Sequence, residues 1–180
     1  VPREVLAWLN RLSALLAGLA RVCDLGQPAT TKTPAAIQAT RPAGEGFCEQ
    51  ALVLCRAVQA HARQQGLRVV TAVCDAGGNP VVLLRDDDAY IASVDIAANK
   101  AFTSVSLKMT TAELGRLAQP GAPLYGVQHT NAGRIVIFGG GVPLVRDGAI
   151  IGGFGVSGGS AEQDTALADY ALDFFGKEML

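Results

Sequence analysis

The chain has 180 residues, of which 49% are hydrophobic and 17% are charged, so it can bury a core and is not a disordered protein. Fifteen basic and sixteen acidic residues give a net charge of -1, and no run of like charges could follow a phosphate backbone or an anionic bilayer, which disfavours nucleic acid and membranes as partners. The four cysteines form no Cys-x-x-Cys pair, which is typical of reduced thiols in a cytoplasmic protein.

The N-terminal quarter predicts a helix and then a linker. Residues 1–24 carry one apolar stripe at helical spacing, formed by Val5, Leu9, Leu12, Leu16 and Leu19. Glu4, Asn10 and Arg11 interrupt the apolar stretch, so we expect a soluble amphipathic helix and not a signal peptide. Residues 25–46 lose this spacing and are rich in Gly, Pro and Thr, as linkers are. Because Val1 leads directly into helical sequence, we expect a piece of a longer protein.

Residues 47–180 predict the main domain. Helical spacing covers Phe47–Gln65, and Gly66 follows it as a C-cap. Two β-like runs, Leu67–Cys74 and Val81–Leu84, flank a Gly-Asn-Pro turn and predict a hairpin. A second helix is expected over Tyr90–Lys108, with an apolar stripe of Ile91, Val94, Ala98, Phe102 and Val105, and a short helix over Thr111–Leu117.

The C-terminal third predicts three more strands and a helix. The strands are expected over Arg134–Phe138, Val142–Val145 and Ala149–Val156, with Asp147-Gly148 as the turn between the last two. Ser160 and Gln163 form a capping box for the final helix. Strands joined by tight turns pair antiparallel, so the fold class is α+β: a five-stranded antiparallel sheet flanked by helices, with the N-terminal helix added.

Glycine-rich segments supply the first candidate site residues. The run from Gly153 to Gly158 satisfies Gly-x-Gly-x-x-Gly, but its strand comes from a hairpin and no return strand follows, which argues against a dinucleotide site. Ser157, Gly158, Gly159 and Ser160 place backbone N–H groups at a helix N-terminus, where they could bind a carboxylate or phosphate or serve only as a cap. Gly139 and Gly140 could admit a ligand close to the backbone or form a turn.

Polar residues supply the others. Asn99, Lys100 and Thr103 fall within one helical turn and are expected to emerge at one edge, where Lys100 could pair with a ligand carboxylate or simply face solvent. His61 lies near a helix end and is expected to be structural. His129 lies in a loop and could be an axial ligand to a tetrapyrrole metal or a solvated side chain.

Several motifs together resemble the GlcG/HbpS-like family: Val73-Cys74-Asp75-Ala76-Gly77-Gly78, Asn99-Lys100-Ala101-Phe102-Thr103, Gln119-Pro120-Gly121, Phe138-Gly139-Gly140-Gly141-Val142-Pro143-Leu144 and Ile151-Gly152-Gly153-Phe154-Gly155-Val156-Ser157-Gly158-Gly159. The resemblance spans nearly all of residues 47–175. It implies a five-stranded antiparallel sheet in a profilin-like layered architecture, homo-oligomers and, in several members, haem binding. No catalytic activity common to the family is implied.

The first helix resembles a different family. Val5-Leu6-Ala7-Trp8-Leu9-Asn10-Arg11-Leu12-Ser13 is similar to the last helix of PduO-type ATP:cob(I)alamin adenosyltransferases, although Ala14 stands where that helix usually carries an acid. By this resemblance, Asn10 and Arg11 would border the nucleotide site of the parent enzyme. A helix, a linker and a GlcG-like domain reproduce the order of a two-domain PduO-type protein.

These resemblances imply an accessory domain that oligomerises and binds a small-molecule tetrapyrrole, haem or a corrinoid, with no catalytic residues of its own. Lys100 and the N–H groups of residues 157–160 would receive carboxylates, and Phe102 and Phe138 would contact the ring, beside Thr103, Gly139 and Gly140. The axial ligand would be His129, Cys48 or none. The alternatives are a small-molecule enzyme that uses the same pocket and a pure oligomerisation scaffold.

Overall fold

The computed structural model describes residues 46–179. The predicted helix over residues 1–24 and the linker up to residue 45 lie outside the described residues. Everything described below belongs to the unit Arg41–Leu180.

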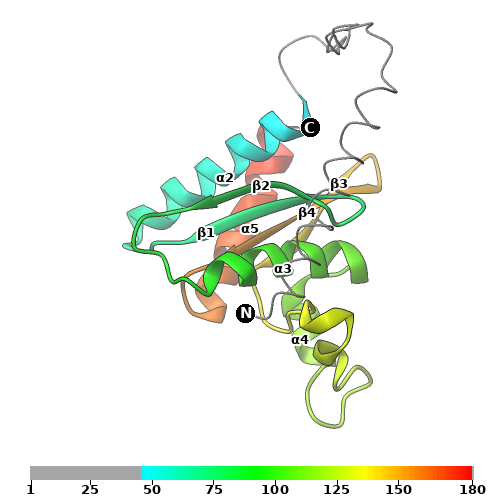
Figure 1. The fold of residues 1–180 in the computed structure, drawn as a ribbon. Coiled ribbons are helices and arrows are strands. Elements are labelled where there is room, and N and C mark those ends of the chain that lie inside the picture. The colour runs from blue at the N-terminus through cyan, green and yellow to red at the C-terminus, as the bar shows by residue number, and fades with distance from the viewer. Residues whose placement is uncertain (1–45, 180) are drawn as a thin grey trace, which may run out of the picture. The chain divides into compact units, whose positions relative to one another are not determined.

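The described unit is a four-stranded antiparallel sheet with helices on both faces (Figure 1). The strands lie in the order β2-β1-β4-β3. Helices α2 and α5 pack together on one face, and α3 packs on the other. The elements in chain order are α2 (Phe47–Gln64), β1 (Val70–Asp75), β2 (Pro80–Arg85), α3 (Ser93–Leu107), α4 (Thr111–Leu117), the short 3-10 helices η1 (Val127–His129) and η2 (Asn131–Gly133), β3 (Gly141–Arg146), β4 (Ala149–Ser157) and α5 (Ala161–Glu178).

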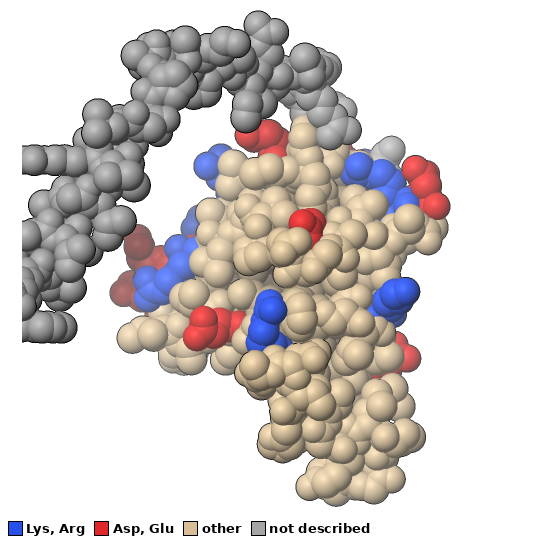
Figure 2. All heavy atoms as spheres, turned by 45° about the vertical axis from the view of Figure 1, so that its right-hand side comes forward, with Lys and Arg blue, Asp and Glu red and all other residues tan. Residues whose placement is uncertain are grey.

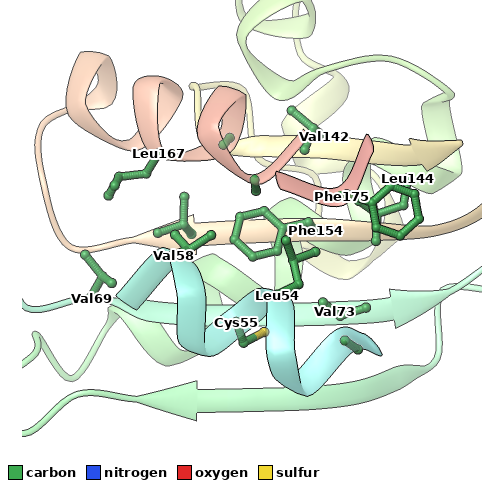
Figure 3. Close-up of a cluster of buried hydrophobic side chains, with 14 of the residues drawn as sticks. Leu54, Cys55, Val58, Val69, Val73, Val142, Leu144, Phe154, Leu167 and Phe175 are labelled. Carbon is green, nitrogen blue, oxygen red and sulfur yellow. The ribbon is translucent and has the colours of Figure 1, made fainter. Parts of the chain in front are cut away.

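The face under α2 and α5 holds the main apolar core (Figure 3). Leu54 and Val58 of α2 point at Phe154, which lies near the middle of this cluster. Leu167 and Phe175 join them from α5. Each of these side chains is almost completely buried, and full burial of such a side chain is worth about 1.5–3 kcal/mol. This face therefore supplies most of the hydrophobic stabilisation of the sheet.

The face under α3 is built from small residues. The backbone of α3 approaches the sheet so closely that a Cβ atom at Gly155 would collide with the carbonyl oxygen of Ala97. The other small residues of this contact are Gly141, Gly153, Ala72 and Cys74 of the sheet and Ala101 and Ser104 of α3. Glycine is required here by the close approach, because any larger side chain would push the helix away.

The predicted apolar stripe of the α3 helix was wrong. The buried side of α3 is Ser93, Ala97, Lys100, Ala101, Thr103, Ser104 and Val105. Of the predicted stripe only Val105 is buried, and Ile91, which is 87% exposed, precedes the helix. The physical reason is the glycine-lined sheet, which accepts small residues and excludes the larger apolar ones.

The prediction of five strands was also wrong, because the segment expected over Arg134–Phe138 is not a strand. Ile135 and Val136 are buried, as the apolar run indicated. The N–H group of Val136, however, donates to Oγ1 of Thr103 at 3.0 Å. This segment packs on α3 through a side-chain hydrogen bond and does not join a strand ladder.

The turn and cap signals were confirmed. Asp147 and Gly148 both have positive φ, at 50° and 74°, as a two-residue hairpin turn between β3 and β4 requires. The capping box at the start of α5 is complete, with Ser160 accepting from the N–H of Gln163 and the Gln163 side chain accepting from the N–H of Ser160. The first hairpin, between β1 and β2, is present as well.

Candidate functional site

An open cavity of about 240 Å³ lies where β4 ends and where α3 and α5 begin. Its wall combines small, aromatic and polar residues: Tyr90, Ala92, Ser93, Ile96, Phe138, Ser157, Gly158, Gly159, Ala161 and Asp164. The cavity depends on three elements that are far apart in the sequence. Ser157 is the last residue of β4, Ser93 is the first of α3, and Ala161 is the first of α5.

Two buried serines form part of the polar wall. Oγ of Ser93 lies 3.0 Å from Oγ of Ser157, and both residues are at least nine-tenths buried. A hydroxyl group has one hydrogen to donate, so one serine donates to the other and the second keeps a free hydrogen. The pair can therefore donate one hydrogen bond to a bound molecule.

A buried ion pair lies beside the serines. Nζ of Lys100 donates to Oδ2 of Asp164 at 2.6 Å and to the carbonyl oxygen of Val156 at 2.8 Å. The side chains of Lys100 and Asp164 are 0% and 3% exposed. Burial lowers the pKa of Lys100 and raises the pKa of Asp164, while the attraction between the two charges opposes both shifts. Asp164 belongs to the cavity wall, and Lys100 lies behind it.

Aromatic and apolar side chains surround the cavity entrance. Phe138 is 42% exposed, and its ring centroid lies 4.9 Å from Nζ of Lys100. Tyr90 is 72% exposed, and the neighbouring Ile91 is also exposed. A protein rarely leaves large apolar side chains together in solvent unless they contact something. The entrance therefore offers apolar surface to a ligand or to another protein surface.

The structure brings five of the predicted site residues to this cavity. Phe138, Ser157, Gly158 and Gly159 line it, and Ser160 caps the adjacent helix α5. The N–H groups in this stretch already have acceptors, because Gly159 donates to Oδ1 of Asp164 at 2.9 Å and Ser160 donates to Gln163. These groups act as a cap and leave little free donor capacity for an anion.

Lys100 was expected at a solvated edge together with Asn99 and Thr103, and that expectation was wrong. Lys100 and Thr103 are both 0% exposed. The absence of a Cβ at Gly155 lets α3 approach the sheet so closely that Lys100 extends along the end of β4 instead of into solvent. Its charge is satisfied within the protein by Asp164.

Four other predicted site residues lie away from the cavity wall. The central guanidinium carbon of Arg134 lies 3.6 Å from the ring centroid of Phe102. The hydroxyl of Thr103 donates to the carbonyl oxygen of Asn99 and accepts from the N–H of Val136. Gly139 and Gly140 leave room that the protein itself fills, since a Cβ at Gly140 would come within 2.7 Å of Nζ of Lys100.

The candidate axial ligand does not border the cavity either. His129 is exposed in η1, and its ring contacts the side chain of Gln128. His61 stacks on Tyr170 of α5 at 4.0 Å between ring centroids, which fits the structural role expected for it. Within residues 46–179, no group of three or more His, Cys, Asp or Glu side chains is arranged to bind a metal ion.

Sequence reasoning missed Asp164, Ser93 and Tyr90. Asp164 follows the capping box directly, and an acid in the first turn of a helix is usually explained by the helix dipole alone. Its partnership with Lys100 joins residues 64 positions apart. Nothing local in the sequence signals this contact.

Comparison with known proteins places these features in a family. The family model described as "Haem degrading protein HbpS-like" matches residues 48–173. The chain belongs to the HbpS-like family. This match covers every element from α2 to most of α5, including all the residues of the cavity wall.

Two curated relatives of this HbpS-like chain come from Citrobacter freundii. The first is a 15.0 kDa protein of the dhaT-dhaS intergenic region, 49% identical over 124 residues, covering 69% of this chain and 87% of the relative. The second is the corrinoid adenosyltransferase PduO, 39% identical over 182 residues. That match covers 96% of this chain, which spans about half, 54%, of PduO.

Solved HbpS-like structures share the fold. The Klebsiella pneumoniae protein ORFY has a TM-score of 0.71 and 41% identity, covering 76% of this chain and 97% of ORFY. A PduOC:heme complex has a TM-score of 0.68 and 42% identity, covering 73% of this chain and 94% of the other. A double mutant of HbpS from Streptomyces reticuli has a TM-score of 0.65 and 29% identity, covering 83% of this chain and 99% of the other.

In the view of Figure 2, basic and acidic side chains are scattered and form no continuous patch of one sign. None of the described helices is long and apolar enough to cross a membrane.

Proposed function

We propose that this domain is a PduO-type C-terminal accessory domain that binds a tetrapyrrole, either haem or a corrinoid. The observation that carries this is the cavity at the ends of α3, α5 and β4, with its exposed apolar entrance, in a chain 42% identical to the protein of a PduOC:heme complex. The family description as haem-degrading and the match to PduO over 96% of this chain support the same assignment.

The size of the cavity decides how a tetrapyrrole would bind. Pockets that enclose drug-sized ligands measure roughly 300–1,000 Å³, and this cavity measures about 240 Å³. It therefore accepts one edge of the ring. The remaining ring surface would lie against Tyr90 and Phe138 at the entrance, where their rings supply aromatic contacts.

Titration of the purified chain with haemin and with aquacobalamin, followed by absorption, tests this placement. Phe138→Ala removes a ring contact at the entrance, so we expect the affinity for the tetrapyrrole to fall about tenfold. Tyr125→Ala is the control, because Tyr125 is also an exposed aromatic residue but lies outside the cavity wall. Spectra identical to those of the free ligands at stoichiometric protein would refute the proposal.

The axial ligand needs a separate test. The residues of the cavity wall include no histidine, cysteine or methionine, and His129 lies outside it. We propose binding without an axial ligand from the cavity. His129→Ala should then leave the Soret band of bound haem unchanged, whereas a shifted band would restore His129 as the ligand.

We also propose that the domain forms a homo-oligomer. Strands β2 and β3 are the edges of the sheet, and Leu83 and Val145 on these strands are large, apolar and exposed. Closed homo-oligomers are the usual way to cover such surfaces. Light scattering should give a mass several times 18.6 kDa, and a monomeric mass would contradict this.

The proposed setting is a cytoplasmic protein that carries this domain beside a corrinoid adenosyltransferase. Burial raises the pKa of both Cys55 and Cys74 to about 11, so these thiols are unreactive core residues, as in a reducing compartment. We expect this chain alone not to adenosylate cob(I)alamin, because only Val5–Ser13 resemble the adenosyltransferase part of PduO-type proteins. Turnover with ATP and reduced cobalamin would contradict that.

A small-molecule enzyme is the second candidate. The buried Lys100–Asp164 pair favours it, since opposed pKa shifts at the wall of an open cavity are typical of acid-base sites. Chemical conversion of a bound tetrapyrrole, detected by mass spectrometry after incubation with the protein, would support it over simple binding.

A further inference from the structure

The polar residues of the cavity wall favour one kind of ligand side group over another. We infer that Ser93, Ser157 and Asp164 together bind a primary carboxamide, so that the cavity accepts the amide-bearing edge of a corrinoid in preference to the carboxylate-bearing edge of haem. This inference rests on the proposed function, because it concerns which tetrapyrrole edge enters the cavity.

The charge of the wall is the first argument. Asp164 is the charged residue of the cavity wall, and Lys100 is not part of that wall. Two of the donors of Lys100 are used by Asp164 and by the carbonyl oxygen of Val156, and its charge lies 4.9 Å from the Phe138 ring. An incoming carboxylate would therefore meet the carboxylate of Asp164 and find no opposite charge to pair with in the wall, because Lys100 is already paired.

The N-terminus of α5 is the second argument. A helix N-terminus attracts anions only through free N–H groups. The N–H groups of Gly158 and Gly159 hydrogen-bond to Asp164 and the N–H of Ser160 donates to Gln163. Ser157 lies in the ladder between β4 and β1. Asp164 thus already occupies the place that a ligand anion would take.

The remaining polar capacity is the third argument. The Ser93–Ser157 pair keeps one hydroxyl hydrogen, and both serines are at least nine-tenths buried at the cavity wall. The carboxylate of Asp164 accepts from Lys100, Gly159 and Gly158, which leaves about one of its four lone-pair sites. The wall therefore offers one donor and one strong acceptor. A primary carboxamide carries the matching groups, because its C=O accepts and its NH2 donates, whereas a carboxylate only accepts.

A pair of ligands with the same ring tests this directly. Dicyanocobinamide carries carboxamide side chains, and dicyanocobyrinic acid carries carboxylates at the same positions. We expect the native chain at pH 7 to bind the amide form at least tenfold more tightly, because hydrogen bonds to charged groups are worth about 1.5–3 kcal/mol. Dissociation constants come from absorption titrations. Equal affinities, or tighter binding of the carboxylate form, would overturn the inference.

Two variants locate the preference in the wall. Asp164→Asn removes the negative charge at nearly constant shape, and we expect the preference for the amide form to fall by about tenfold or more. The double variant Ser93→Ala, Ser157→Ala removes both hydroxyl groups, because either serine alone would keep a hydrogen to donate, and it should weaken binding of the amide form. Ser104→Ala is the matched control, because Ser104 is a buried α3 serine that bonds to Ala101 outside the cavity wall.

The outcomes separate the two proposals. If neither corrinoid nor haemin binds, the proposed function fails and the inference fails with it. If the rings bind without preference, or if Asp164→Asn and the double serine variant both retain the full preference, only the inference is overturned. If Asp164→Asn loses its circular dichroism signal, the double serine variant alone decides, since Lys100 and Asp164 remain paired in it.

Discussion

The two faces of the sheet carry their helices in different ways. Under α2 and α5 the contact consists of large apolar side chains around Phe154. Under α3 it consists of glycines, alanines and serines, with a buried ion pair at one end. The apolar face can tolerate movement of side chains, whereas the α3 face depends on backbone approach. A site that needs fixed polar groups is therefore built at the end of the α3 face.

Removal of one charge of the ion pair should produce the largest effect. Asp164→Ala leaves Lys100 charged and buried, so we expect a loss of about 3–5 kcal/mol in the free energy of unfolding, measured with urea. The double variant Lys100→Met, Asp164→Leu removes both charges and should be less destabilised than the single one. If Asp164→Ala costs less than about 1 kcal/mol, the buried ion pair contributes far less to the free energy of unfolding than its burial suggests.

A cavity in the apolar face should cost nearly as much. Leu54 is fully buried, and Leu54→Ala should lower the free energy of unfolding by about 2–5 kcal/mol through lost burial and the cavity left behind. Val53 is the neighbouring control, since it is about half exposed. Val53→Ala should change stability by no more than about 0.5 kcal/mol, and similar losses for both variants would contradict the described core.

A single added methyl group tests the close approach of α3. Gly155→Ala places a Cβ against Ala97 and should destabilise the domain by about 1–3 kcal/mol, because the helix must shift. Gly176→Ala is the opposite case, since it adds a Cβ to α5 where nothing lies within 4 Å. That change should stabilise the protein by up to about 1 kcal/mol through helix propensity, as measured by thermal unfolding.

The helix cap next to the cavity should give the smallest effect. Ser160→Ala removes the side chain that accepts from the N–H of Gln163, and should cost about 1 kcal/mol in urea unfolding. Thr165→Ala removes an exposed hydroxyl that bonds only within the helix, and we expect a change within about 0.5 kcal/mol. Equal losses would mean that the cap does not hold the start of α5 in place.

Local patterns in the sequence were enough for most elements. The hairpin turn at Asp147-Gly148, the capping box at Ser160 and the helix bounds of Thr111–Leu117 were all predicted and confirmed. Each of these signals acts over a few residues, through backbone dihedrals or a single hydrogen bond, so the local sequence contains all the information. The resemblance to the HbpS-like family likewise depended on contiguous motifs.

Tertiary structure alone decided which face of α3 is buried, which segment joins the sheet and where Lys100 points. Large apolar residues predicted a different face of α3, because their spacing contains no information about the glycines of β4 that exclude them. The segment around Val136 has the composition of a strand, yet Thr103 provides its hydrogen bond. Lys100 pairs with Asp164 across 64 residues. All three outcomes depend on contacts between distant parts of the chain, which the periodicity of a single segment cannot predict.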